Sequence, residues 1–154
     1  MRYLFSDLIT QAAHQDARII LIIGDFGYGL FNDFPRSQLL NIGICEQSMI
    51  SVAAGMALEG LRPWVYTITP FLIERPFEQI KLDIDQQNAN VKLVGYADYP
   101  DQGPTHAEID APKLMSLFKN IRSYFPKTER EVRDALVDAS WPGPAFISLK
   151  KAGD

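Results

Sequence analysis

The chain has 154 residues, the length of one ordinary domain, and 47% of them are hydrophobic, so a packed core is expected and global disorder is excluded. Its 15 basic and 19 acidic residues give a net charge of −4, which argues against nucleic-acid binding because no excess of cations is present. The single cysteine excludes an internal disulfide framework and a multi-cysteine metal site, and two histidines leave little room for a histidine-rich metal centre.

Segments with helical and strand-like patterns alternate from the N-terminus onward. Residues 6–16 have apolar side chains at helical spacing, and residues 18–23 form a largely β-branched apolar run that is typical of a strand buried on both faces. The elements expected next, in chain order, are a helix at 46–59, a strand at 64–68, a helix at 75–87, a strand at 91–94, a short helix at 111–118, a strand at 121–125, a helix at 128–139 and a strand at 144–149.

This alternation predicts a single α/β domain over residues 1–154, with a doubly wound, mainly parallel sheet flanked by helices. Thr128 and Glu131 form a capping-box pattern, in which the Thr128 hydroxyl accepts from the Glu131 amide and the Glu131 side chain reaches back. Ligands of such sheets bind at the carboxyl ends of the strands. Functional residues are therefore expected in the loops at 24–35, 41–46, 67–75 and 95–110.

The loop at 24–29 has three glycines, which permit positive φ and close backbone approach. This composition fits a phosphate cradle, and it fits an ordinary strand-to-loop turn equally well. The spacing matches neither the dinucleotide fingerprint nor the P-loop.

The segment at 41–49 reads N-I-G-I-C-E-Q-S-M and is followed by A-A-G-M-A at 53–57. Glu46 is expected at or near a helix start, where the helix dipole favours a carboxylate by ~0.3–1 kcal/mol. On this pattern alone, Glu46 is either a structural N-terminal glutamate or a functional acid. Cys45 is expected to be a small packing residue and Met49 a core residue, whereas His14 is expected at the surface.

Three motifs in this order resemble the pyrimidine-binding domain of transketolase-like, thiamine-diphosphate enzymes. The segment around Glu46 is similar to the N-x-G-I-x-E-Q-x-M stretch of that family. Residues 66–79, Y-T-I-T-P-F-L-I-E-R-P-F-E-Q, are similar to its T-F-x-x-F … R-x-[FY]-[DE]-Q region. Residues 103–106, G-P-T-H, are similar to the same four residues in transketolases and deoxyxylulose-phosphate synthases. The resemblance covers nearly the whole chain.

The resemblance implies that Glu46 is catalytic and binds the cofactor. In the family, this glutamate hydrogen-bonds N1′ of the aminopyrimidine and favours the 4′-imino tautomer, which removes the thiazolium C2 proton; the cofactor supplies the electron sink. Phe71 matches the aromatic residue that stacks on the aminopyrimidine, although a core phenylalanine fits its pattern too. Ile68 replaces the first aromatic residue of that motif, and Ile44 and Ile68 are expected to wall the pocket.

His106 is the second catalytic candidate, because an imidazole can exchange a proton or donate to a substrate oxygen near neutral pH; an isolated loop histidine is the alternative. Arg75 matches the family arginine and is expected either to bind an anionic group or to pair with Glu74 or Glu78. Gln102 occupies a position that is acidic in many transketolases. The further substrate-binding candidates are His106, Arg75, Gln102 and Asp25.

The diphosphate half of a thiamine-diphosphate site has a G-D-G motif, and Phe26 stands where the second glycine of that motif would follow Asp25. We therefore expect no metal ligands in this chain, with Mg²⁺ or Ca²⁺ held by a partner subunit and by the diphosphate. The partner is expected to supply the diphosphate-binding domain in a heterodimer or heterotetramer, and the chain alone is expected to be inert.

The leading hypothesis is the pyrimidine-binding subunit of a split transketolase, which transfers a two-carbon ketol unit between sugars or sugar phosphates. The alternatives are a subunit of a two-chain thiamine-diphosphate 2-oxo-acid decarboxylase and a non-catalytic interaction module of the same fold. No apolar run approaches the ~18 residues of a membrane span, and the N-terminus lacks a secretory pattern. A cytoplasmic protein without a membrane or nucleic-acid partner is expected.

Overall fold

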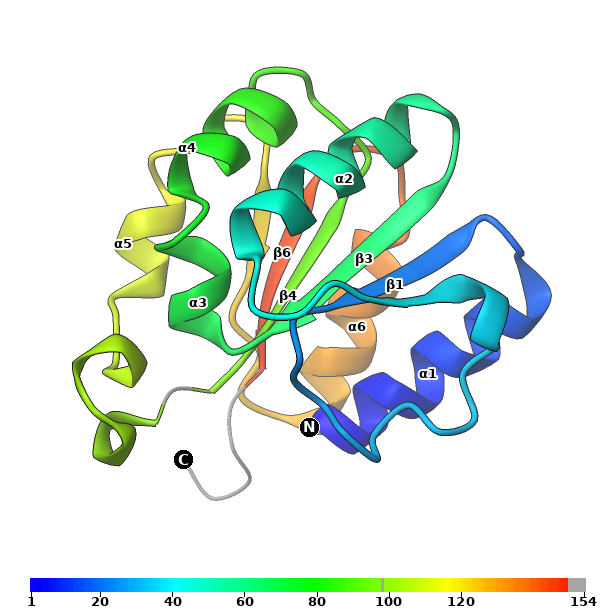
Figure 1. The fold of residues 1–154 in the computed structure, drawn as a ribbon, viewed down its shortest axis with the longest axis horizontal. Helices are drawn as coiled ribbons and strands as arrows, with labels where there is room; N and C mark the ends of the chain where they lie inside the picture. Colours follow the sequence, from blue (N-terminus) through cyan, green and yellow to red (C-terminus); the bar gives the residue numbers. More distant parts are fainter. Residues whose placement is uncertain (98, 150–154) are drawn as a thin grey trace.

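Six parallel strands form one sheet between two layers of helices (Figure 1). The computed structural model describes residues 1–97 and 99–149. The strands lie in the order β2-β1-β3-β4-β6-β5, and every neighbouring pair is parallel. Their bounds are β1 (Ile19–Ile23), β2 (Leu39–Asn41), β3 (Arg62–Thr67), β4 (Lys92–Tyr96), β5 (Arg122–Tyr124) and β6 (Ala145–Leu149). The predicted α/β class with a parallel sheet is thus confirmed.

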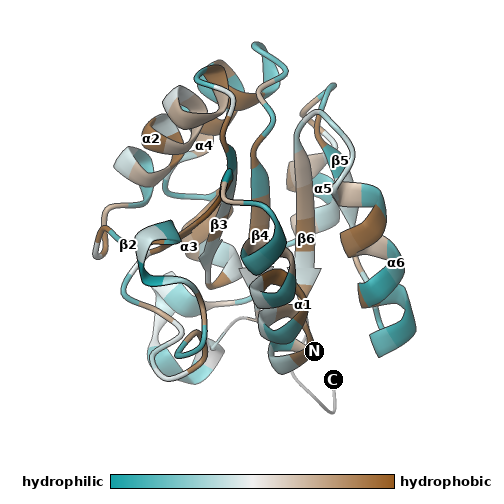
Figure 2. Cartoon of the chain, turned by 90° about the vertical axis from the view of Figure 1, so that its right-hand side faces the viewer, coloured by the Kyte–Doolittle hydropathy of each residue, from teal (hydrophilic) through white to brown (hydrophobic). Residues whose placement is uncertain are grey.

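The helices divide between the two faces of the sheet. The α-helices are α1 (Arg2–Gln15), α2 (Glu46–Leu58), α3 (Thr69–Ile73), α4 (Phe77–Gln79), α5 (Ala111–Met115) and α6 (Glu129–Ala139). A π-helical turn, η2 (Ile80–Asp85), continues α4, and the 3₁₀ turns are η1 (Arg36–Gln38), η3 (Pro100–Gln102) and η4 (Pro104–His106). In Figure 2 the strands lie between α2 and α4 on one side and α6 on the other.

The alternating side chains of the strands build a separate hydrophobic cluster on each face. On one face, Val65 packs with residues of α2, η2 and α5, including Met49 and Ile50. On the other face, Tyr66 packs with residues of α1 and α6, including Phe5 and Val132. Because both faces are covered, the central strands are largely apolar, as expected for a doubly wound sheet.

Several boundaries differ from the prediction. Helix α1 begins at Arg2 instead of residue 6, because Phe5 is fully buried and its ring lies 5.5 Å from that of Tyr66. Strand β2 was not predicted: it has three residues at the sheet edge, too few to show an alternating pattern. Helix α3 lies in the segment predicted as a loop, and Pro70 occupies its first turn, where proline is favoured.

The predicted cap of α6 is confirmed in one half. The Thr128 hydroxyl accepts from the amide of Glu131 at 3.2 Å, as expected. The Glu131 carboxylate, however, accepts from the amide of Lys127 at 2.7 Å, one residue outside the cap. Within the described residues, no helix is long and apolar enough to cross a membrane.

An ion-pair network at the amino ends of the strands predicts a pH-dependent stability. The pKa of the Asp16 carboxyl is held well below its usual range by hydrogen bonds from Arg18 and from Arg62, whose Nη1 donates at 2.9 Å. A depressed carboxyl pKa stabilises the fold above the unfolded value of ~3.9, and this contribution is lost as the pH falls through the folded pKa. We expect Asp16→Asn to lower the free energy of unfolding at pH 7 by about 1 kcal/mol.

Urea denaturation at pH 7 and at stepwise lower pH measures this contribution. The difference between the wild type and Asp16→Asn is expected to shrink progressively below about pH 4. Asp7→Asn, at an exposed position of α1, is the matched control and is expected to leave the unfolding midpoint nearly unchanged. A difference that stays constant down to about pH 2.5 would show that the charge of Asp16 does not stabilise the fold.

Candidate active site

A cavity of about 400 Å³ opens at the carboxyl ends of β1 and β3. The chain order reverses here, since β1 is paired with β2 on one side and with β3 on the other, and such a switch point is the usual ligand site of an open α/β sheet. We call it the carboxyl-edge cavity. Its lining residues are Gly24, Asp25, Phe26, Ile44, Thr67, Ile68, Phe71, Tyr99, Gln102 and His106.

Asn41 ties together the loops that follow β1 and β2. Its Oδ1 accepts from the backbone amide of Asp25 at 3.1 Å and from that of Gly43 at 3.0 Å. Asp25 has φ of +52°, a left-handed conformation that is uncommon for a residue with a side chain. Because strained backbone persists only where its surroundings hold it, Asn41 is the contact that fixes the position of Asp25 at the cavity mouth.

Glu46 is the first residue of α2, as the sequence predicts. Its side chain is only 5% exposed, and its Oε1 accepts from Nη1 of Arg75 at 2.8 Å. The next turn of α2 places Met49 in the core, where it packs so closely beneath the β1 loop that a Cβ on Gly24 would lie 2.8 Å from its sulfur. The carboxylate of Glu46 thus lies at the N-terminus of α2 and is hydrogen-bonded to Arg75.

Arg75 also covers the ring of Phe71. Its guanidinium carbon lies 3.4 Å from the centroid of the Phe71 ring, which is the separation of a stacked contact. The backbone around Arg75 is anchored separately, since its carbonyl accepts from Nε2 of Gln47 at 3.4 Å. One arginine thus joins the acid of α2 to the aromatic residue of α3.

His106 lies on the cavity side of the same phenylalanine. The centroid of its ring is 4.6 Å from that of Phe71, and the two planes meet at 66°, an edge-to-face arrangement. The histidine is placed by the turn η4, which follows Gly103 with φ of +102°, and its Nδ1 lies 3.0 Å from the hydroxyl of Thr105. Glu46, Arg75, Phe71 and His106 therefore form one continuous row of contacts.

The structure brings the predicted site residues together from four loops. Six of them line the carboxyl-edge cavity: Asp25, Ile44, Ile68, Phe71, Gln102 and His106. Glu46 and Arg75 are not among the lining residues of this cavity and connect to it through Phe71. Ile44 is 65% exposed, so any contact it makes with a ligand would be made from the rim.

Two side-chain expectations were wrong. Arg75 was expected to pair with Glu74 or Glu78 if it had a structural role, but its partner is Glu46, 29 residues away. Cys45 was expected to pack in the interior, but it is exposed, because it precedes α2 in the loop that carries Ile44 outward. His14 is exposed and Met49 is fully buried, so these two predictions are confirmed.

Thr67 is a lining residue that sequence reasoning missed. It ends β3, is fully buried, and its hydroxyl has no hydrogen-bond partner among the residues that the structure describes. A buried hydroxyl without a partner carries a desolvation penalty of about 1–3 kcal/mol, which a ligand atom can relieve. Its position as a polar residue at the carboxyl end of a predicted strand was the signal that could have identified it.

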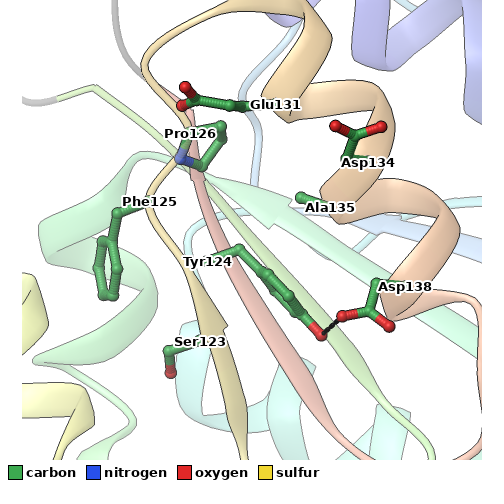
Figure 3. Close-up of a pocket in the computed structure, with 8 residues that line it drawn as sticks. All are labelled: Ser123, Tyr124, Phe125, Pro126, Glu131, Asp134, Ala135 and Asp138. Carbon is green, nitrogen blue, oxygen red and sulfur yellow. Dashed lines mark hydrogen bonds between the residues drawn. The ribbon is translucent and has the colours of Figure 1, made fainter.

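A second cavity, of about 490 Å³, lies between β5 and α6 and is lined by none of the predicted site residues (Figure 3). Figure 3 shows Tyr124 pointing toward Asp138, to whose carboxylate its hydroxyl donates at 2.7 Å. Burial and this hydrogen bond raise the pKa of Tyr124 to about 12. Across residues 1–97 and 99–149, no group of three acidic, histidine or cysteine side chains is arranged to hold a metal ion.

Comparison with known proteins points to one family. The model of the transketolase pyrimidine-binding domain matches residues 1–152. A subunit of the apulose-4-phosphate transketolase of Actinobacillus succinogenes is 40% identical over 121 residues, which are 76% of this chain and 39% of that protein. The 1-deoxy-D-xylulose-5-phosphate synthase of Bacillus velezensis is 34% identical over 84% of this chain and 21% of that protein.

The structural comparison agrees with the sequence comparison. A solved split-gene transketolase, an inactive β4 tetramer, superposes with a TM-score of 0.84 at 26% identity, over 99% of this chain and 51% of that one. The chain therefore spans about half or less of the length of the proteins it matches.

Proposed function

Since the chain belongs to the family of transketolase pyrimidine-binding domains, we propose that it is the pyrimidine-binding subunit of a split, thiamine-diphosphate-dependent enzyme. The reaction is the transfer of a two-carbon ketol unit between sugars or sugar phosphates. One observation carries the proposal: Glu46 is buried at the start of α2 and joined, through one flat cation, to the ring of Phe71. The likeness to transketolase subunits and synthases supports the ketol chemistry.

The residues present fit the aminopyrimidine of the cofactor. The guanidinium of Arg75 is planar, positively charged and a hydrogen-bond donor, and it is accommodated between Glu46 and Phe71. An aminopyrimidine protonated at N1′ has the same three properties. The unpartnered hydroxyl of Thr67 offers a further hydrogen bond at the cavity wall.

Each residue has a role that follows from its position. Glu46 accepts the N1′ hydrogen bond from a site with little water, where a charge-assisted hydrogen bond is strong. Phe71 stacks on the heterocycle, which adds ~0.5–1.5 kcal/mol beyond burial. When bound, the cofactor supplies the carbon nucleophile and the electron sink. His106, whose ring contacts that of Phe71, lines the carboxyl-edge cavity and donates to or protonates a substrate oxygen there.

Substrate contacts are proposed for the polar residues at the cavity mouth. Asp25 and Gln102 are exposed and line the carboxyl-edge cavity, so their side chains can hydrogen-bond the hydroxyl groups of a sugar. Arg75 carries a positive charge for an anionic group such as a phosphate. The diphosphate and its Mg²⁺ or Ca²⁺ are assigned to a partner polypeptide, with which this chain forms a heterodimer or heterotetramer.

A binding experiment tests the divided site. The purified chain is expected to bind thiamine diphosphate with Mg²⁺ only weakly, with Kd above about 1 mM by isothermal titration calorimetry, because the diphosphate contributes much of the affinity through its own set of ligands. Adding a partner chain that carries the G-D-G motif is expected to lower Kd at least about a hundredfold. Micromolar binding by the isolated chain would contradict the divided site.

Product analysis of the assembled pair identifies the reaction. Ketol transfer from a ketose phosphate to an aldose phosphate, followed in a coupled assay, is the expected result. Release of CO₂ from a small 2-oxo acid without ketol transfer would instead identify a decarboxylase. An assembled pair that binds the cofactor but turns over neither substrate class would favour a non-catalytic module.

A further inference from the structure

Arg75 already contacts the two side chains that an aminopyrimidine would need, those of Glu46 and Phe71. Its Nη1 is hydrogen-bonded to Oε1 of Glu46 at 2.8 Å, and its guanidinium carbon lies 3.4 Å above the centre of the Phe71 ring. The ring of His106 makes an edge-on contact with the same phenylalanine, at 4.6 Å between centroids. The guanidinium thus covers one face of Phe71, and a ring that stacks on this face next to Glu46 must displace it.

The group that must move is the guanidinium, because only Arg75 also engages the carboxylate. A heterocycle that left Arg75 in place would find that face of the Phe71 ring covered and one oxygen of Glu46 already bonded. Moving His106 would free neither the stacked face nor the acid. When the Arg75 side chain rotates away, the Glu46 carboxylate and the face of Phe71 are therefore freed together.

The surroundings of Arg75 allow this rotation without a change of fold. Its side chain is 34% exposed, whereas that of Glu46 is 5% exposed, so the guanidinium has a route to solvent and the carboxylate has none. The backbone of Arg75 is held separately by Gln47, and Phe71 is positioned by α3. A guanidinium keeps its positive charge in both places, in contact with the carboxylate and in water.

We propose that Arg75 is a resident occupant of the aminopyrimidine site, a positioning residue that keeps Glu46 and Phe71 in place until the cofactor takes over both contacts. The exchange replaces one planar cation by another, so the buried carboxylate is never left without a donor, a condition that would be strongly destabilising. This inference rests on the proposed function, because it assumes that an aminopyrimidine binds at Glu46 and Phe71. After displacement, the guanidinium is free to face the cavity mouth.

Competition of this kind predicts that removing the occupant tightens binding. The probe is 4-amino-5-hydroxymethyl-2-methylpyrimidine, the aminopyrimidine half of thiamine, titrated into the full chain and followed by NMR, which detects millimolar affinities. Arg75→Met is expected to lower Kd about tenfold relative to the wild type. Arg75→Gln, which keeps a donor for Glu46 without the charge, is expected to fall between them. Arg130→Met, at an exposed position of α6, is the control and is expected to leave Kd unchanged.

The wild type provides a second readout that does not depend on how the variants fold. The Nε–H resonance of Arg75 is expected to be shifted upfield by the ring current of Phe71 and to lose that shift as the probe saturates the site. An Arg75 signal that is unchanged at saturation, or weaker binding by Arg75→Met, would overturn the occupant role.

Two further variants separate the ways in which the test can fail. If Glu46→Ala and Phe71→Ala lose binding while Arg75 stays in place, the proposed cofactor site stands and only the occupant role fails. If the wild type and all the variants fail to bind the probe at any concentration, both the occupant role and the proposed function are contradicted.

Discussion

Glu46→Ala is expected to lower kcat of the assembled enzyme by about 10³-fold or more, because proton transfer in the cofactor depends on a carboxylate at this position. Glu46→Gln is expected to be nearly as inactive, since an amide can accept a hydrogen bond but cannot carry the charge. Both variants should fold, because Glu46 lies at a helix start, not in the centre of the hydrophobic core. Steady-state kinetics of the reconstituted pair, with circular dichroism as a check on folding, measure the effect.

The matched control for this experiment lies at the other end of the same helix. Glu59 follows α2 at its carboxyl end and is exposed, so Glu59→Gln removes one negative charge from the same element without touching the site. Its kcat is expected to stay within a factor of about two of the wild type. A Glu46 variant with near-wild-type turnover would reject the catalytic role of this carboxylate.

Gly95→Ala is expected to reduce the free energy of unfolding by about 2 kcal/mol, the effect of inserting a methyl group into a closely packed interior. A Cβ on Gly95, in β4, would lie 2.6 Å from Oγ1 of Thr69 and 3.1 Å from its Cα. The hydroxyl could rotate, but the Cα belongs to the backbone at the start of α3, so that helix would have to shift. Chemical denaturation of the purified chain measures the loss.

Gly55 offers the opposite case within the same molecule. It lies in α2 and is exposed, and a Cβ built on it would have no atom within 4 Å among the described residues. Gly55→Ala is therefore expected to stabilise the chain by about 0.5–1 kcal/mol, because alanine loses less backbone entropy than glycine in a helix. Equal effects of the two substitutions would show that the contact with Thr69 does not limit the packing.

The contact between Gly95 and Thr69 links the sheet to the site. Thr69 begins α3, and its amide donates to the carbonyl of Ala97 at 3.1 Å, so the helix is fixed against the end of β4. Phe71 lies two residues further along this helix. A shift of α3 in Gly95→Ala would therefore move Phe71 relative to Glu46, and the same variant should bind the aminopyrimidine probe more weakly.

The amino-acid sequence by itself determined the class of fold and the segments that build the site. The β-branched run at 18–23 has the pattern of a strand buried on both faces, the segment at 91–94 is strand-like, and both contribute parallel strands to the sheet. The helix that begins at Glu46 was predicted because apolar residues recur at helical spacing from Ile50 to Ala57 and Gly60 follows as a stop. The three motifs share one edge because parallel strands end together there.

Only the tertiary structure decided which side chains meet. Arg75 has two acidic neighbours in sequence, Glu74 and Glu78, yet it pairs with Glu46, because the end of α3 directs it toward the start of α2. Helix α3 lies in a predicted loop, since five residues are too few to display a period of 3.6. The ion pair of Arg75 with Glu46 and the edge-to-face contact of Phe71 with His106 arise from contacts between distant segments. The local sequence pattern predicts the periods of helices and strands and the caps of helices. Contacts between distant residues depend instead on how the loops that follow four strands come together at one edge of the sheet.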